Sequence, residues 1–331
     1  MSLLVDGDLK EDWFDSEQTD GEFIRKDSQF RNWVTADGKP GPTGHGGYKA
    51  EAGRYHLYVS HACPWAHRTL IFRTLKKLED VISFSVVHPY MGSKGWSFES
   101  CPDLHNDEAD GDPIYDHDFL FKNYAMADPD YSGIVTVPVL WDKKQNTIVN
   151  NESSEIIRML NSGFGDLANE LDMYPNHLRE DIDEINAFIY DNINNGVYKT
   201  GFATTQASYE SAFSKLFDAL DTVEQRLNQQ RYLVGNELTE ADWRLFTTLL
   251  RFDPVYVGHF KCNRRRIADY PNLSNYLREL YQHPGISNTV NMEHIKQHYY
   301  TSHPMINPTG IVPLGPDTDL NAPHDRQRFS I

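Results

Sequence analysis

The stretch that decides the fold is Tyr55-His56-Leu57-Tyr58-Val59-Ser60-His61-Ala62-Cys63-Pro64-Trp65-Ala66-His67-Arg68-Thr69-Leu70. Its first five residues alternate apolar side chains, a pattern typical of a strand. Pro64 suits the first turn of a helix, where its missing N–H would have no partner anyway. The residues Leu70, Ile71, Thr74, Leu75 and Leu78 then recur at helical spacing. Cys63 is therefore predicted to lie where a strand ends and a helix begins.

That position predicts a reactive cysteine. The start of a helix carries partial positive charge and N–H groups, which favour a thiolate over a thiol. An isolated cysteine is more often a small buried side chain, but the strand–Cys–Pro–helix context favours the nucleophile. A thioredoxin-like redox pair would need a second cysteine where Ala66 stands. An oxidised Cys63 would then need an outside thiol, and glutathione is the obvious intracellular candidate.

The composition narrows the class of protein. The 331 residues carry a net charge of −17, which argues against nucleic-acid and anionic-membrane partners. Three scattered cysteines, Cys63, Cys101 and Cys262, form no disulfide framework and fit a reducing compartment. We interpret Cys101 and Cys262 as structural. There is no signal-peptide pattern at the start and no run of ~18 apolar residues, so we expect a cytoplasmic protein.

The chain around this stretch divides into recognisable segments. Residues 1–48 are polar and predict an extended arm with three aromatic anchors, Phe23, Phe30 and Trp33. Residues 82–87 predict a second strand, parallel to the first if the intervening helix is a crossover. Residues 88–132 lack periodicity and predict a long loop, which in a compact domain is usually functional. Trp96 in this loop could cover a ligand or pin the loop.

Residues 135–142 and 147–150 have the signature of a hairpin. Pro138 inside the first of these runs indicates an edge strand, a bulge or a cis peptide. A helix opens after the hairpin, with Ser153 expected as its N-cap. The resulting order, β-α-β, loop, β-β-α, is that of a thioredoxin-like domain.

From about residue 175 the pattern is helical only. Thr239-Glu240-Ala241-Asp242 resembles a capping box with Asp in the place of Glu or Gln. Two apolar stripes and a further helix accompany it: Leu178, Ile182, Ile185, Phe188, Ile189 and Ile193; Tyr209, Phe213, Leu216, Leu220, Val223 and Leu227; and Leu273 to Tyr281. We therefore predict four parts: an arm (1–48), a thioredoxin-like domain (49–165), an all-helical domain (166–303) and an irregular tail (304–331).

This arrangement resembles the fold of a cytosolic glutathione transferase. Within that superfamily, six strings resemble the glutathionyl-hydroquinone reductases, or Xi-class glutathione transferases. They are Cys63-Pro64-Trp65-Ala66-His67-Arg68; Val137-Pro138-Val139-Leu140-Trp141-Asp142; Asn151-Glu152-Ser153; Asn195-Gly196-Val197-Tyr198-Lys199; Gly258-His259-Phe260-Lys261-Cys262-Asn263; and Asn307-Pro308-Thr309-Gly310-Ile311-Val312-Pro313.

The resemblance implies a thiol-dependent reduction. The Cys63 thiolate attacks the sulfur of a glutathionyl-hydroquinone, the ring leaves as a hydroquinone, and a second glutathione resolves the mixed disulfide. Tyr198 matches the tyrosine that protonates the leaving ring, a role that suits a phenol because it stays protonated at neutral pH. Tyr256 and Tyr299 match tyrosines near the cysteine, where hydroxyl donors favour its anion.

The resemblance also implies a glutathione site. Trp96 matches a tryptophan lying against glutathione, and Glu152 with Ser153 matches the pair that holds the γ-glutamyl end. The site further includes Ile134, Val135, Thr136 and Val137, with Val137 before an expected cis Pro138 offering its backbone to the cysteinyl part. Ile134 is a departure, because arginine is expected there and isoleucine cannot pair with a carboxylate.

Other interpretations stay open at this point. An omega-class-like thioltransferase reducing dehydroascorbate or mixed disulfides would share the single cysteine, and a non-catalytic binding module would share the fold. His294 and His298, four residues apart, could bind a metal from one helix face. No third ligand with suitable spacing is present, so we expect no metal. Family resemblance implies a homodimer.

Overall fold

The computed structural model describes residues 2–10, 19–101 and 111–329. These residues form two compact units, each described by itself below. The sheet unit comprises residues 2–10, 27–101, 111–171 and 289–302. The helical unit comprises residues 19–26, 172–288 and 303–329.

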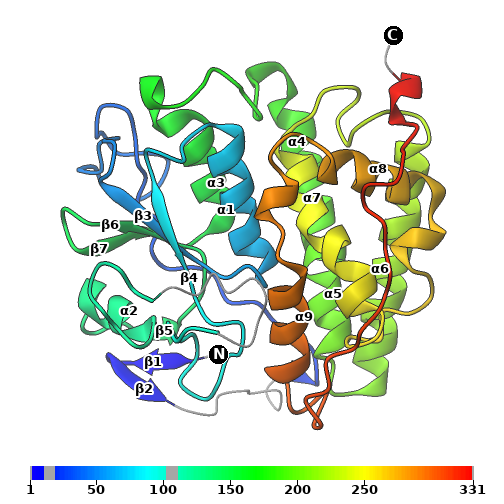
Figure 1. The fold of residues 1–331 in the computed structure, drawn as a ribbon, viewed down its shortest axis with the longest axis horizontal. Coiled ribbons are helices and arrows are strands. Elements are labelled where there is room, and N and C mark those ends of the chain that lie inside the picture. The colour runs from blue at the N-terminus through cyan, green and yellow to red at the C-terminus, as the bar shows by residue number, and fades with distance from the viewer. Residues whose placement is uncertain (1, 11–18, 102–110, 330–331) are drawn as a thin grey trace. The chain divides into compact units, whose positions relative to one another are not determined.

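The sheet unit is built on a four-stranded mixed sheet in the order β4-β3-β6-β7 (Figure 1). Its strands are β3 (Tyr55–Val59), β4 (Ser83–Val86), β6 (Val139–Asp142) and β7 (Thr147–Asn150). β3 pairs parallel with β4 and antiparallel with β6, and β6 pairs antiparallel with β7. Every residue of β3 is buried. The predicted parallel pair and hairpin are confirmed, although the hairpin's first strand begins only after Pro138.

Helices α1 (Pro64–Leu75) and α3 (Ser153–Arg158) pack side by side in this unit (Figure 1). The prediction that Ser153 caps α3 is wrong, because the N-cap is Glu152. The Glu152 carboxylate reaches the backbone N–H of Ser154 at 3.0 Å, which leaves Ser153 as the first helical residue. A carboxylate accepts this otherwise unpaired donor as well as a hydroxyl does.

Two parts of the sheet unit differ from the sequence prediction. The predicted loop contains helix α2 (Phe121–Ala127), while residues 102–110 of that loop lie outside the described residues. The predicted arm contributes β1 (Leu3–Val5) and β2 (Asp8–Lys10), which form a small antiparallel sheet with β5 (Gly133–Ile134). Strands of two or three residues are too short to show an alternating pattern.

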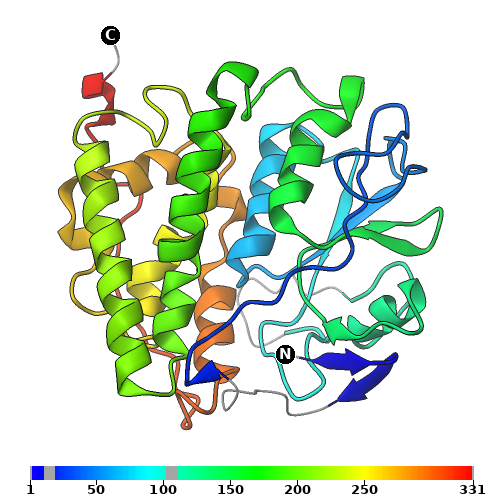
Figure 2. The ribbon, with the colours of Figure 1, turned by 180° about the vertical axis from the view of Figure 1, so that it is seen from behind.

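The helical unit contains five α-helices within its described residues: α4 (Arg179–Ile189), α5 (Gly196–Gly201), α6 (Gln206–Leu227), α7 (Glu240–Arg251) and α8 (Pro271–Tyr281). α5 packs along α6, as the view from behind shows (Figure 2). The predicted stripes face inward for the most part, with Ile182, Ile185, Leu216 and Leu220 all buried. One more helix, α9 (Met292–Thr301), belongs to the sheet unit.

Short 3₁₀ and π segments complete both units. The 3₁₀ segments are Gly165–Leu167, Asn176–Leu178, Ile267–Asp269, Ser287–Thr289 and Arg326–Phe329, and the π segments are Met159–Gly163, Tyr190–Asn194 and Phe252–Tyr256. The tail is irregular until its last 3₁₀ turn, as predicted. There the buried Arg326 donates to the backbone oxygens of Leu227 and Gln230 at 2.7 and 2.6 Å.

The predicted capping box at the start of α7 is present and fully buried. Asp242 Oδ2 accepts from the backbone N–H of Thr239 at 2.9 Å. Asp242 Oδ1 accepts from Leu233 N and from the Tyr276 hydroxyl, at 2.9 and 2.7 Å. Burial raises the pKa of Asp242 to about 6. A raised carboxyl pKa means that the stability from this group is present below pH ~4 and is lost as pH rises through about 6.

We expect Asp242→Asn to lower the free energy of unfolding by about 2 kcal/mol at pH 5, because an amide nitrogen brings two N–H donors, where a protonated carboxyl has one O–H, toward the backbone N–H of Thr239 or Leu233. The loss should be about 1 kcal/mol smaller at pH 7.5, since the wild type has by then lost part of its own contribution. Urea denaturation at both pH values measures this. The control is Asp269→Asn, an exposed carboxylate in a similar cap, which should cost less than about 1 kcal/mol. A larger loss at pH 7.5 than at pH 5 would contradict the assignment.

Candidate active site

Cys63 is the N-cap residue of α1, at the end of the short turn that follows β3, as predicted. Its backbone has φ −77° and ψ 121°, and Pro64 is the first helical residue. The backbone N–H of Cys63 donates to Ser60 O at 3.1 Å, and its carbonyl accepts from His67 N at 3.0 Å. These bonds close the turn between strand and helix, and they hold the Cys63 side chain at the positive end of α1.

The Cys63 thiol meets the segment just before β6. Its Sγ donates to the backbone oxygen of Val137 at 3.5 Å. The Val137–Pro138 peptide is cis, which confirms the expectation for this bond. A carbonyl acceptor favours the thiol form, whereas the helix start favours the thiolate, so the two influences on Cys63 oppose each other in the absence of a ligand.

The segment from Ile134 to Val137 is mostly tied into the protein. Val135 N donates to Ser2 O at 3.0 Å, and the Ile134 carbonyl accepts from the Tyr131 hydroxyl at 3.1 Å. Thr136 exchanges hydrogen bonds with the Tyr124 hydroxyl through both its backbone N–H and its carbonyl. Within the described residues, the Val137 N–H has no hydrogen-bond partner. The Val137 backbone is thus the part of this segment that is able to pair with a peptide ligand beside Cys63.

Glu152 and Ser153 lie at the start of α3 and belong to the sheet unit, as Cys63 does. Glu152 Oε2 accepts from the Ser28 hydroxyl at 3.4 Å, and its other oxygen caps the helix. Ser153 is buried, and the Arg68 guanidinium donates to its hydroxyl at 3.5 Å. Because Arg68 belongs to α1, this contact links the helix that carries Cys63 to the helix start that carries Ser153.

Trp96 is held by α9 within the sheet unit. Its ring stacks on His298, with centroids 4.9 Å apart and an interplanar angle of 24°. His298 Nδ1 donates to Pro89 O at 2.8 Å, so the same histidine fixes the loop that carries Trp96. Tyr299 follows on α9, is buried, and packs edge-on against His298.

Tyr198 and Tyr256 belong to the helical unit, where they lie together. Their ring centroids are 6.1 Å apart, and Tyr256 stacks on Phe260 at 5.4 Å. Tyr198 also stacks on Phe202 at 6.1 Å. Both tyrosines are buried, at 9% and 0% exposure. The predicted catalytic residues therefore divide between the units: Cys63 and Tyr299 lie in the sheet unit, and Tyr198 and Tyr256 in the helical unit.

Sequence reasoning missed the supporting residues Arg68 and His298. In the sequence, the spacing of four residues between His294 and His298 indicates a possible metal site and gives no sign that His298 contacts Trp96. The structure pairs the two differently: His298 stacks on Trp96, and His294 packs edge-on against His61 at 5.6 Å. In the described part of the chain, no group of three or more His, Cys, Asp or Glu side chains is placed to hold a metal ion.

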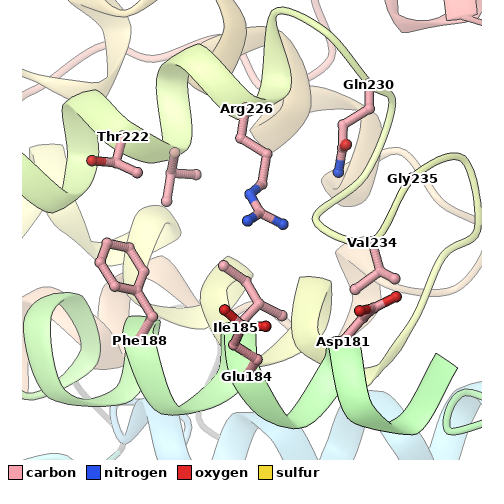
Figure 3. Close-up of a pocket in the computed structure, with 10 residues that line it drawn as sticks. Asp181, Glu184, Ile185, Phe188, Thr222, Arg226, Gln230, Val234 and Gly235 are labelled. Atoms are coloured by element: carbon pink, nitrogen blue, oxygen red, sulfur yellow. The ribbon is translucent and has the colours of Figure 1, made fainter.

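A separate pocket lies in the helical unit between α4 and α6 (Figure 3). Arg226 points into it from α6, opposite the carboxylates of Asp181 and Glu184 on α4. None of the predicted site residues lines it. Among the helices of the described chain, none is long and apolar enough to cross a membrane.

The three cysteines should differ sharply in reactivity. Cys63 is partly exposed, whereas Cys101 and Cys262 are buried at 4% and 0% exposure. Burial raises the pKa of the Cys262 thiol far above its usual value. We expect iodoacetamide at pH 7 to modify Cys63 at least ~10-fold faster than either of the others. Peptide mass spectrometry over time measures this; faster labelling of Cys101 or Cys262 would contradict it.

The comparisons with known proteins agree with this fold. Residues 62–162 match the family described as glutathione S-transferase, N-terminal domain, and residues 206–279 match its C-terminal domain. A protein of Escherichia coli K12 named glutathionyl-hydroquinone reductase YqjG is 58% identical, over 98% of each chain. Another, glutathionyl-hydroquinone reductase PcpF of Sphingobium chlorophenolicum, is 53% identical over 97% of this chain and 98% of its own.

Solved structures give the same result. The glutathione-bound structure of YqjG from Escherichia coli K-12 matches with a TM-score of 0.89 and 56% identity, over 98% of this chain and 99% of that one. A Xi-class glutathione transferase from Natrialba magadii matches with a TM-score of 0.89 and 49% identity, over 99% and 97% of the two chains. The fold and the cysteine site define a glutathione transferase. Within that class, the chain belongs to the glutathionyl-hydroquinone reductase family, the Xi-class glutathione transferases.

Proposed function

We propose that this protein uses glutathione to reduce glutathionyl-hydroquinones to hydroquinones. The observation that carries the proposal is the position of Cys63 at the start of α1, with Ala66 where a resolving cysteine would stand. Such a thiol can take up one glutathionyl group and must give it to an outside thiol. A relative that is 58% identical over nearly the whole chain bears the name glutathionyl-hydroquinone reductase.

In the first step the Cys63 thiolate attacks the sulfur of the substrate's glutathionyl group. A sulfur–sulfur bond forms, the bond between that sulfur and the aromatic carbon breaks, and its electron pair stays with the ring. The ring carbon takes a proton from the Tyr198 hydroxyl, and the ring leaves as a hydroquinone. A positioned proton donor of this kind typically contributes ~10²–10⁴-fold in rate.

In the second step a glutathione thiol loses its proton, which restores the proton that Tyr198 gave to the ring, and the resulting thiolate attacks the sulfur of the glutathionyl group on Cys63. Oxidised glutathione leaves, and Cys63 returns as a thiolate, a form that we propose the hydroxyls of Tyr256 and Tyr299 favour. The balance is one substrate and one glutathione consumed, and one hydroquinone and one oxidised glutathione released. Cys101 and Cys262 are buried and take no part.

Glutathione is proposed to lie along the segment from Ile134 to Val137. The Val137 backbone pairs with its cysteinyl part, Trp96 lies against it, and the helix start at Glu152 and Ser153 holds the γ-glutamyl end. Ile134 and the neighbouring Val135 and Thr136 contribute shape rather than charge. Glu152 presents a carboxylate to the ammonium group, and the backbone at Ser153 presents donors to the carboxylate.

The assembly and location of the protein are part of the proposal. We infer a homodimer from the family resemblance, and a cytoplasmic enzyme from three cysteines that form no disulfide. We also propose that the chain divides into an arm, a glutathione-binding domain, a helical domain and a tail, with boundaries after residues 48, 165 and 303.

The experiment is a steady-state assay of the purified protein with glutathione and a glutathionyl-hydroquinone. We expect hydroquinone and oxidised glutathione to appear in a one-to-one ratio, measured by chromatography. Dehydroascorbate and hydroxyethyl disulfide are tested in parallel, because they are the substrates expected of an omega-like thioltransferase. That alternative is tested because a protein of Schizosaccharomyces pombe named glutathione S-transferase omega-like 2 is 51% identical over 90% of this chain and 94% of its own. Turnover of those substrates without any release of hydroquinone would overturn the proposal.

A further inference from the structure

A short arm segment, residues 19–26, is part of the helical unit. It is anchored at the start of α6, where the hydroxyls of Thr205 and Ser208 donate to Asp20 O at 3.4 and 3.1 Å. Thr204 N donates to Gly21 O at 3.1 Å. The segment then brings Phe23 and Arg25 against the aromatic cluster around Tyr198.

Arg25 lies directly on Tyr198. Its guanidinium carbon is 4.9 Å from the centroid of the Tyr198 ring and 5.3 Å from that of Phe23. Its Nε donates to Asn195 Oδ1 at 2.6 Å. Asn195 caps α5 and is buried, and Tyr198 stands three residues further on the same helix. One helix therefore carries both the side chain that orients the guanidinium and the ring that the guanidinium covers.

A cation over an aromatic face is attracted by the ring, and more strongly so once the ring carries negative charge. When Tyr198 gives up its proton, the charge left on its oxygen spreads into the ring below Arg25. The guanidinium stays charged throughout, since its own proton is not lost at any accessible pH. Arg25 therefore stabilises the state that Tyr198 reaches after the proton has moved.

The surroundings of Tyr198 strengthen this effect. Aromatic rings that contact it include Phe23 at 6.1 Å, Phe202 at 6.1 Å, Tyr256 at 6.1 Å and Phe260 at 5.6 Å. These rings carry no charge at neutral pH and exclude water from most of the Tyr198 ring, which is 9% exposed. In such a poorly screened environment, a charge at this separation has a larger effect than it would in water.

We propose that Arg25 is a positioning residue that makes Tyr198 a stronger proton donor. The inference rests on the proposed function, because it needs a step in which Tyr198 protonates the departing hydroquinone ring. It assigns a task to the arm segment, which delivers a fixed cation to the face of a tyrosine in the helical unit. It also explains why the guanidinium is oriented by a buried amide instead of being left to solvent.

The test measures Arg25 variants on two substrates, a glutathionyl-hydroquinone and hydroxyethyl disulfide, first in the wild-type protein and then in a Tyr198→Phe variant. Arg25→Gln should lower kcat for a glutathionyl-hydroquinone about 10-fold. It should leave reduction of hydroxyethyl disulfide within about twofold of the wild type, because the thiolate released there needs no carbon protonation. Arg25→Lys should recover part of the loss, since it restores the charge without the planar fork. The matched control is Lys26→Gln, which removes the neighbouring exposed charge and should not change either rate.

The decisive experiment is a double-mutant cycle between Arg25 and Tyr198. In a Tyr198→Phe background there is no proton to tune, so Arg25→Gln should cause no further loss with the hydroquinone substrate. A full additional loss in that background, an equal loss on both substrates, or no loss at all would overturn the role of Arg25. Disulfide reduction by the same preparations reports whether each variant is folded. A wild type that releases no hydroquinone would instead overturn the proposed function itself, so the two failures are distinguishable.

Discussion

Cys63→Ala is expected to abolish reduction of glutathionyl-hydroquinones, with a loss in kcat on the order of 10⁴-fold or more. Cys63 provides the sulfur on which the glutathionyl group is held, and the described structure places no second cysteine beside it in α1. Cys63 caps α1 through its backbone and not through its side chain. The variant should therefore fold normally, and circular dichroism with a thermal melt checks this.

The matched controls are Cys101→Ala and Cys262→Ala. Both side chains are buried, so each change should cost about 1 kcal/mol of stability and leave kcat within a few-fold of the wild type. If the Cys262→Ala variant were inactive but had the thermal stability of the wild type, Cys262 would have to take part in the reaction. Appreciable turnover by Cys63→Ala would remove the covalent step altogether.

Tyr198→Phe is expected to lower kcat for a glutathionyl-hydroquinone by ~10²–10⁴-fold, the usual worth of a positioned general acid. The substitution keeps the ring and its stacking on Phe202, and it removes the proton. Hydroxyethyl disulfide should lose little, because its leaving thiolate needs no carbon protonation. Single-turnover rates on both substrates measure the difference.

The corresponding control is Tyr256→Phe, which removes a hydroxyl from the neighbouring ring at 6.1 Å. If Tyr256 supports the Cys63 anion and not the leaving ring, both substrates should slow by a similar factor. Equal losses for Tyr198→Phe on both substrates would assign Tyr198 to the cysteine or to packing. Unchanged rates on both would take it out of the site.

Features that depend on a few residues close together in the chain could be predicted from the sequence. The turn at Cys63 and Pro64 was one, because the strand pattern, the proline and the helical repeat follow each other within sixteen residues. The capping box of α7 was another, since Thr239 and Asp242 are one helical turn apart. The cis peptide before Pro138 was one of three outcomes that the position of the proline allowed, and the resemblance favoured it.

Features that join distant segments could not be predicted in this way. The β1–β5 pairing brings Leu3 to Ile134, and neither short strand shows a period of its own. The stack of Trp96 on His298 likewise joins residues far apart along the chain. Tyr198 is one of 18 tyrosines, and only the family resemblance singled it out. The contact of Arg25 with that ring became visible only in three dimensions.

In the proposed reaction, Cys63 carries the glutathionyl group between the two half-reactions. The most direct measurement is a single turnover with one equivalent of glutathionyl-hydroquinone and no added glutathione, quenched in acid and analysed by intact and peptide mass spectrometry. We expect one hydroquinone released per protein and one glutathionyl group on the peptide that contains Cys63. Release of hydroquinone with an unmodified Cys63, or with a disulfide between Cys63 and Cys101 or Cys262, would contradict it.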